Sequence, residues 1–231
     1  KEFPKKDAFR YLDDAVTFED LNTRSSQLAN YLMSHDVKKG DRVGILMPRC
    51  LETAIAVYGI LKSGAAYVPI DPFLPIERVN FLIEDCGIRH LVTIPKQSKK
   101  IKKILSAKNG LKTIIGISDI DIIKYVSWNS IFSSSLNGYN PVNILGEDLS
   151  YILYTSGSTG QPKGVVLSFY AMGVAASGVA QALDINPSDR MLSYLPLAHV
   201  FERYAIEQSS LHIGSQLFFA DALDTFLEDL R

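Results

Sequence analysis

Cysteine is scarce in this chain of 231 residues: only Cys50 and Cys86 occur. They form no CxxC pair and stand near no histidine cluster, which excludes a zinc site of the usual spacing and a disulfide framework. Two reduced thiols are typical of a cytoplasmic protein. The chain begins with KEFPKKDAFR, which has neither Met nor the basic-then-apolar pattern of a signal peptide, so nothing here indicates secretion.

An excess of either charge is also absent. The chain has 24 Lys and Arg against 25 Asp and Glu, a formal net charge of −1. A nucleic-acid-binding protein would usually carry a basic excess, so we predict no nucleic-acid partner. The one basic cluster, five lysines within 96–103, is typical of a solvated helix face, although such a face could also meet an anionic membrane or nucleic acid.

A long, uninterrupted apolar run is missing as well. Residues 164–183 carry no charge, but glycine, serine and glutamine dilute the run and it has no flanking aromatic belt. We predict a short buried strand followed by a buried, small-residue helix there.

Both termini look cut: 223–230 has an amphipathic helical pattern with no capping Gly or Asn, so we expect a fragment of a longer protein.

Short apolar runs alternate with helical patterns along the chain, which predicts an α/β fold with a mostly parallel, buried sheet and helices on both faces. Thr17 can cap a helix through about Leu32, and glycines 64 and 87 end two further helices. Residues 118–148 are polar and irregular, which predicts a surface connection. The strands are expected at 42–47, 65–70, 88–94, 111–117 and 149–154.

The stretch YTSGSTGQPKGVV (154–166) begins where the last of these strands ends. Ligands in such sheets bind beyond the carboxyl ends of strands, and consecutive N–H groups in a Gly-rich turn form a cup for phosphate oxygens. Lys163 adds a positive charge. The stretch is neither a Walker A loop nor a GxGxxG fingerprint, and a ligand-free Ser/Gly loop would seldom lie between two apolar strands.

The same stretch resembles the signature of the adenylate-forming (AMP-binding) enzymes, which include acyl-CoA synthetases, luciferases and the adenylation domains of peptide synthetases. Residues 61–87 resemble an upstream motif of that family. YLPLAHVFER (194–203) and LFFADALDTFLEDLR (217–231) resemble the form found in long-chain fatty acyl-CoA synthetases. The resemblance covers about residues 17–231.

The resemblance implies the N-terminal subdomains of the adenylate-forming fold, truncated. Residues of about 1–180 would form a first α/β subdomain and about 181–231 the start of a second, with the C-terminal domain absent. The implied activity is an acid–thiol ligase reaction: a carboxylic acid, with a long-chain fatty acid favoured, reacts with ATP to give an acyl-adenylate, and coenzyme A then displaces AMP. Without the downstream motifs, we expect the 231-residue chain alone to be inactive.

The resemblance also implies the site. Lys163 and His199 would be catalytic, His199 by orienting the acid, although a structural role for this histidine stays open. Glu202 and Arg203 could simply pair with neighbours. The ATP phosphates would be bound by Thr155, Ser156, Gly157, Ser158, Thr159, Gly160, Lys163 and Gly164, and Mg²⁺ by Ser158 or Thr159.

Substrate class depends on position 199. Relatives that activate amino acids place an Asp there to hold the ammonium group, and a buried ammonium without a carboxylate costs several kcal/mol, roughly 2–7 for an unpaired polar group. His199 therefore favours an uncharged acyl tail, while 61–87 looks closer to peptide synthetases. Phe169 stands where many relatives have His.

Two alternatives to the ligase reaction remain: an adenylation module that loads a carrier protein, and a catalytically silent relative. A peripheral membrane contact of the full-length protein would suit a lipid substrate.

Overall fold

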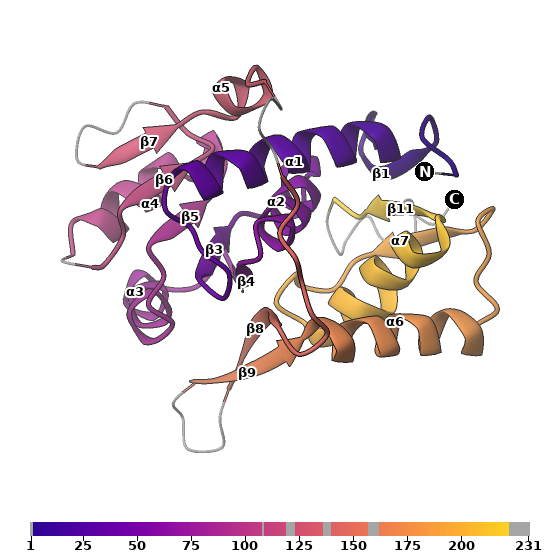
Figure 1. Ribbon diagram of the computed structural model, residues 1–231. Coiled ribbons are helices and arrows are strands. Elements are labelled where there is room, and N and C mark those ends of the chain that lie inside the picture. The colour runs from indigo at the N-terminus through magenta and orange to yellow at the C-terminus, as the bar shows by residue number, and fades with distance from the viewer. Residues whose placement is uncertain (1, 108, 119–122, 136–139, 157–161, 222–231) are drawn as a thin grey trace.

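A seven-stranded sheet forms the larger body of the molecule (Figure 1). The computed structural model describes residues 2–107, 109–118, 123–135, 140–156 and 162–221. All neighbouring strands are parallel except the pair β8–β9, so the predicted α/β fold with a mostly parallel sheet is confirmed. The strand order is β7 (Lys124–Val126), β6 (Thr113–Ile115), β5 (His90–Val92), β3 (Arg42–Leu46), β4 (Ala66–Ile70), β8 (Leu149–Ser156) and β9 (Pro162–Ser168).

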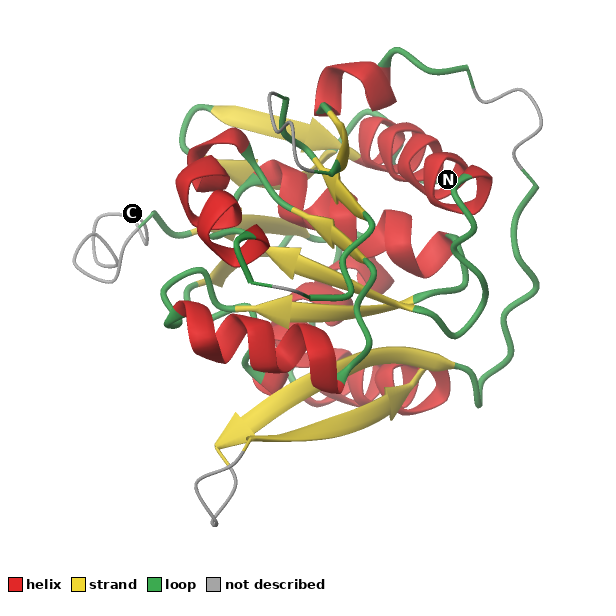
Figure 2. Ribbon diagram, turned by 90° about the vertical axis from the view of Figure 1, so that its left-hand side faces the viewer, coloured by secondary structure: helices red, strands yellow, loops and turns green. Residues whose placement is uncertain are grey.

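Helices cover both faces of this sheet (Figure 2). One apolar core lies under α1 (Phe18–Ser34), α2 (Leu51–Lys62) and α5 (Trp128–Phe132). The other lies under α3 (Ile76–Asp85) and α4 (Ser98–Leu105), which follows the short helix η1 (Pro95–Gln97). The inner strands are buried on both sides, and every residue of β4 is buried. This explains why the strands read as continuous apolar runs rather than alternating ones.

The predicted helix ends are confirmed. The Thr17 hydroxyl accepts a hydrogen bond from the Asp20 N–H at 3.0 Å and caps α1, which runs two residues past the expected Leu32. Gly64 and Gly87 have positive φ values of 79° and 61° just after α2 and α3. A side chain is strained in that conformation, so glycine is favoured at these two helix ends.

Residues 164–183 depart from the prediction. The segment is a strand followed by helix α6 (Phe169–Ala182), but neither is fully buried: Val166 is 66% exposed and Tyr170 is 70% exposed. β9 pairs only with β8 and therefore lies at the edge of the sheet, and α6 buries a single stripe of small residues and Met172. Within the described residues, no helix is both long and apolar enough to cross a membrane.

The expectation of an irregular connection over 118–148 is partly wrong. The segment adds the edge strand β7 and the helix α5, whose Trp128 is 7% exposed. The Trp128 indole N–H donates to the carbonyl oxygen of Thr93 at 2.9 Å. The buried Trp128 therefore links the polar segment 118–148 to the residue that follows β5.

Replacing Trp128 with Phe is expected to lower the free energy of unfolding by about 1.5 kcal/mol, because it removes a hydrogen bond and leaves the buried Thr93 carbonyl without this donor. Urea unfolding measures the change. The control is Tyr125→Phe on β7, where the ring is 43% exposed, and it should change stability by less than about 0.5 kcal/mol. Equal effects of the two changes would contradict this account of Trp128.

A second sheet of four strands stands beside the first. Its order is β10 (Arg190–Ser193), β11 (Gln216–Phe219), β1 (Asp7–Tyr11) and β2 (Asp14–Thr17). β1 runs parallel to β11, with Phe9 opposite Leu217. The π-helix η2 (Glu202–Gln208) and α7 (Ser209–Ile213) connect β10 to β11. The predicted subdomain boundary near residue 181 stays a prediction, and this sheet takes strands from both sides of it. The helix predicted at 223–230 lies outside the described residues.

Candidate functional site

The antiparallel hairpin β8–β9 carries the two ends of the stretch that is predicted to bind phosphate. Thr155 lies opposite Lys163, and Tyr154 lies opposite Gly164. Directly opposed residues of an antiparallel pair present their side chains on the same face, so the Thr155 hydroxyl and the Lys163 ammonium share one face. Both residues are exposed. The structure thus brings these two predicted phosphate ligands together at the end of β8.

The centre of the stretch, 157–161, lies outside the described residues. The predicted phosphate contacts of Gly157, Ser158, Thr159 and Gly160 therefore stay predictions, as does any contact of the Ser156 side chain. The same holds for Mg²⁺ at Ser158 or Thr159. Among the described residues, no group of three or more His, Cys, Asp and Glu side chains could hold a metal ion.

Gly164 lies close to side chains of the neighbouring strand β8. It lies in the extended strand β9 and is not among the glycines with positive φ. A β-carbon at this position would approach Cγ2 of Ile152 to 3.0 Å and Cζ of Tyr154 to 3.4 Å. Glycine at 164 therefore avoids a close contact with the neighbouring strand, and no unusual backbone turn is involved.

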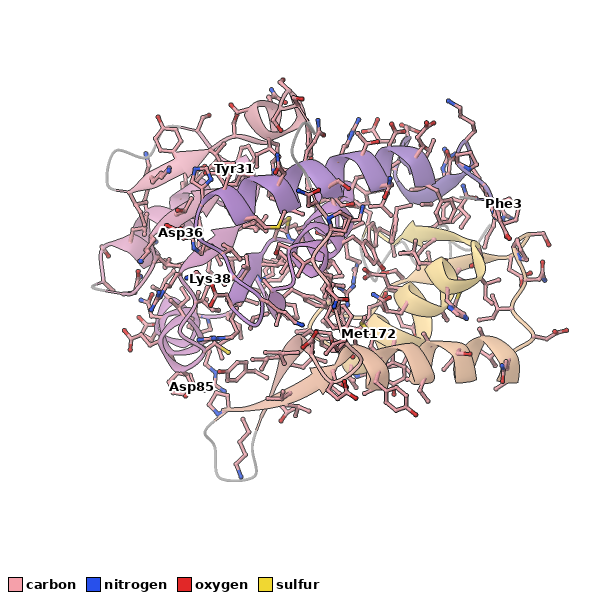
Figure 3. All side chains as sticks on the ribbon, in the orientation of Figure 1. Phe3, Tyr31, Asp36, Lys38, Asp85 and Met172 are labelled. Carbon is pink, nitrogen blue, oxygen red and sulfur yellow. The ribbon has the colours of Figure 1, made fainter. Side chains whose placement is uncertain are left out.

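Tyr154 fixes the base of this hairpin to helix α3. Its hydroxyl donates to the Asp85 carboxylate and lies 3.1 Å from the Cys86 sulfur; Asp85 at the end of α3 is labelled in Figure 3. Burial and the Asp85 carboxylate raise the pKa of Tyr154 well above its usual value. The phenol therefore stays protonated near neutral pH and donates its hydrogen bond to Asp85.

His199 lies in the segment between β10 and η2. Its backbone N–H donates to the Pro196 carbonyl at 2.8 Å, which closes a turn, and its Nδ1 accepts from the Phe201 N–H at 3.3 Å. An accepting Nδ1 cannot carry the proton, so Nε2 carries it in the neutral ring. The ring is exposed, so its Nε2–H can donate to a ligand.

Glu202 and Arg203 are buried, with exposed fractions of 0% and 1%. The guanidinium of Arg203 forms an ion pair with Glu207, one turn further on, and lies over the ring of Tyr67 with 5.9 Å to its centroid. The interpretation of Arg203 as a partner of a neighbour is confirmed. Sequence reasoning missed Glu207, although its spacing of four residues from Arg203 is the usual helical pairing distance.

An apolar cavity of about 230 Å³ lies at the carboxyl ends of β3 and β4. It is bounded by residues that follow these strands, by Arg203, and by the 196–198 segment just before His199. This is the edge of the sheet where the sequence placed ligands. Neither Lys163 nor His199 is among the described lining residues. The apolar lining comprises Ile45, Met47, Pro48, Pro69, Ile70, Pro72, Phe73, Pro196, Leu197 and Ala198.

Known proteins resemble this chain over most or all of its length. A family model described as AMP-binding enzyme matches residues 1–231. Gramicidin S synthase 2 of Brevibacillus brevis is 35% identical over 164 residues, which are 71% of this chain and 3% of that protein. Bacitracin synthase 3 of Bacillus licheniformis is 33% identical over 204 residues, 88% of this chain and 3% of that one. The chain spans only 2–5% of the length of the first curated relatives it matches.

Solved structures of similar fold include two described as fatty acyl-CoA enzymes. A fatty acyl CoA synthetase of Mycobacterium tuberculosis superposes with a TM-score of 0.84 at 26% identity, over 99% of this chain and 45% of that one. A putative long-chain-fatty-acid CoA ligase of Rhodopseudomonas palustris has a TM-score of 0.86 at 23% identity, over 98% of this chain and 56% of that one. The second likeness concerns the fold alone.

Proposed function

The chain belongs to the family of AMP-binding enzymes, and from that premise we propose that the full-length protein activates a carboxylic acid with ATP and passes the acyl group to a thiol. The acid oxygen attacks the α-phosphorus, the bond to the bridging oxygen breaks, and pyrophosphate leaves. The thiol of coenzyme A then attacks the acyl carbon and AMP leaves. The observation that carries the proposal is the β8–β9 hairpin, in which Thr155 lies opposite Lys163 on either side of residues 157–161 of the Ser/Thr/Gly stretch.

The chemistry of these residues suits a pyrophosphate leaving group. Charge accumulates on phosphoryl oxygens as the bond to the α-phosphorus breaks, and fixed donors aimed at those oxygens lower the barrier. Lys163 supplies a full positive charge, and the Thr155 hydroxyl supplies a donor on the same face. Mg²⁺ bound to the phosphates would neutralise further negative charge there. The Nε2–H of His199 would donate to the acid and orient its oxygen for attack.

We propose a long-chain fatty acid as the acid. His199 offers no negative charge for a substrate ammonium group, and the cavity beside its segment is mainly apolar. A hydrocarbon tail gains about 0.8 kcal/mol for each CH₂ that it buries in such a lining. The likeness to the M. tuberculosis fatty acyl CoA synthetase supports the same class.

A second candidate is an adenylation module that loads an acyl or aminoacyl group onto a carrier protein. It is favoured by the 35% identity to gramicidin S synthase 2, which exceeds the identity to the fatty acyl CoA synthetase. The two candidates share the adenylation step and differ in the acid and in the thiol. The acceptor therefore separates them: coenzyme A for the first and a carrier protein for the second.

The full-length protein is expected to release pyrophosphate from ATP with fatty acids of long chain and to form acyl-CoA when coenzyme A is added. A matched panel of short, medium and long fatty acids and of amino acids, read by pyrophosphate release, checks this. We expect at least about a tenfold preference for long over short acids, because each added CH₂ contributes about 0.8 kcal/mol of burial. A response to amino acids alone would show that the fatty-acid assignment is wrong.

A further inference from the structure

Arg49 connects the two sheets at the edge where the site lies. It comes shortly after β3, and its guanidinium reaches the segments that leave the other sheet. Nη1 donates to the carbonyl oxygens of Tyr194 and Leu195, both at 2.8 Å, and Nε donates to the Ala220 carbonyl at 3.1 Å. These carbonyls follow β10 and β11 directly. One side chain that follows a strand of the seven-stranded sheet thus hydrogen-bonds the backbone just beyond two strands of the four-stranded sheet.

Glu202 holds the same segment from the other side. Its Oε2 accepts from the Leu195 N–H at 3.2 Å, and the residue is 0% exposed. Leu195 therefore has its carbonyl bound by a guanidinium and its N–H bound by a buried carboxylate. Hydrogen bonds to charged groups are roughly twice as strong as those between neutral groups. We call Arg49, Leu195 and Glu202 the clamp.

The residues that follow the clamp belong to the site. Pro196, Leu197 and Ala198 form one wall of the apolar cavity. The turn from Pro196 to His199, closed by the hydrogen bond between them at 2.8 Å, then presents the histidine ring. Because this short turn follows Leu195 directly, a displacement of Leu195 moves both the cavity wall and the Nε2–H donor.

We infer that Arg49 is a positioning residue for the carboxylic acid, acting through Leu195 with Glu202 as its counterpart. This inference rests on the proposed function. A near-attack geometry requires reacting atoms about 3–3.5 Å apart, and an error of about 1 Å can cost about 10²-fold in rate. The phosphate-binding hairpin β8–β9 lies on other strands. Loss of the clamp should therefore weaken binding of the acid and slow the chemical step, while the affinity for ATP is retained.

The test uses Arg49→Met in the full-length protein, which keeps the side-chain length and removes the donors. We expect kcat for pyrophosphate exchange to fall at least about tenfold and KM for the acid to rise, with KM for ATP changed less than about twofold. Arg49→Lys restores one charged donor near Leu195 and should recover part of the loss. An unchanged kcat in Arg49→Met would overturn the inference.

Arg42 provides a matched control at the opposite end of β3. Its Nε donates to the Cys86 carbonyl at 2.8 Å and its Nη1 to the Gly40 carbonyl at 3.3 Å. Arg42→Met thus also removes guanidinium-to-carbonyl bonds, but far from His199 along the strand. We expect it to lower stability comparably and to leave kcat within about twofold of the wild type. If both variants lower kcat equally, the role of Arg49 is structural only and the inference is wrong.

Amide hydrogen exchange at Leu195 gives a readout that needs no activity. We expect exchange at this N–H to become at least about tenfold faster in Arg49→Met and to stay unchanged in Arg42→Met. If the wild-type protein adenylates no acid but Leu195 responds in this way, the proposed function fails and the clamp stands. If Leu195 exchanges at the same rate in both variants, the clamp is refuted whatever the activity shows.

Discussion

Glu207→Leu is expected to lower the free energy of unfolding by about 3 kcal/mol, because it leaves the guanidinium of Arg203 buried without its ion-pair partner. Arg203 and Glu207 are each 1% exposed, so water cannot replace the lost carboxylate. The neighbouring Glu202 limits the loss, since its carboxylate also acts on Arg203. Urea unfolding of the wild type and the variant measures the difference.

Two further variants separate the charge effect from lost packing. The double variant Arg203→Met with Glu207→Leu removes both charges and should regain most of the loss, because apolar replacements of a buried pair are often neutral or stabilising. Glu84→Leu changes an exposed glutamate of α3 in the same way and should shift stability by less than about 0.5 kcal/mol. A double variant no more stable than Glu207→Leu would show that the ion pair is not the source of the loss.

Lys163→Ala in the full-length protein is expected to reduce kcat/KM for ATP in pyrophosphate exchange by about 10²-fold, near 2.7 kcal/mol of transition-state stabilisation. The physical reason is the loss of the positive charge that, in the proposed function, would face the leaving phosphates beside Thr155. Because Lys163 is exposed on an edge strand, its removal should leave stability within about 0.5 kcal/mol of the wild type.

Lys102→Ala on α4 is the control for Lys163, because it removes another exposed lysine at a distance in sequence from the hairpin. We expect its exchange rate to match the wild type. A Lys163 variant within about threefold of the wild type would argue against any phosphate contact by this lysine. A loss that appears together with a lower unfolding midpoint would instead point to a structural role.

Much of the larger sheet could be predicted from the sequence because its strands are buried on both faces. The runs at 42–47 and 65–70 are apolar at nearly every position, and glycines 64 and 87 mark where helices stop. The second sheet could not be predicted in this way. β1 and β2 are short, and β1 pairs with a strand from the far end of the chain, a partner that no local pattern encodes.

The candidate site also contains residues that the sequence could identify and residues that it could not. Thr155, Lys163 and His199 could be found because they belong to stretches that resemble a family, and the structure places the first two opposite each other. Arg49 could not be found, because its role depends on backbone carbonyls that only the fold brings near. Glu207 was missed although its spacing of four residues from Arg203 offered a signal. Residues 164–183 were wrongly expected to be buried, since an apolar sequence does not reveal that a strand lies at an edge.

The parallel pairing of β1 with β11 bears on folding during synthesis. Of the described strands β1 is made first, and its parallel partner β11 is made last. Until then Phe9, which is fully buried and stacked on Phe219 in the folded protein, lies in a strand whose only described strand partner is β2. A two-stranded hairpin alone is marginally stable in water, and its open edge can pair with other chains. The earliest of the described strands is thus among the last of them to be protected, so slow translation would prolong its exposure to aggregation.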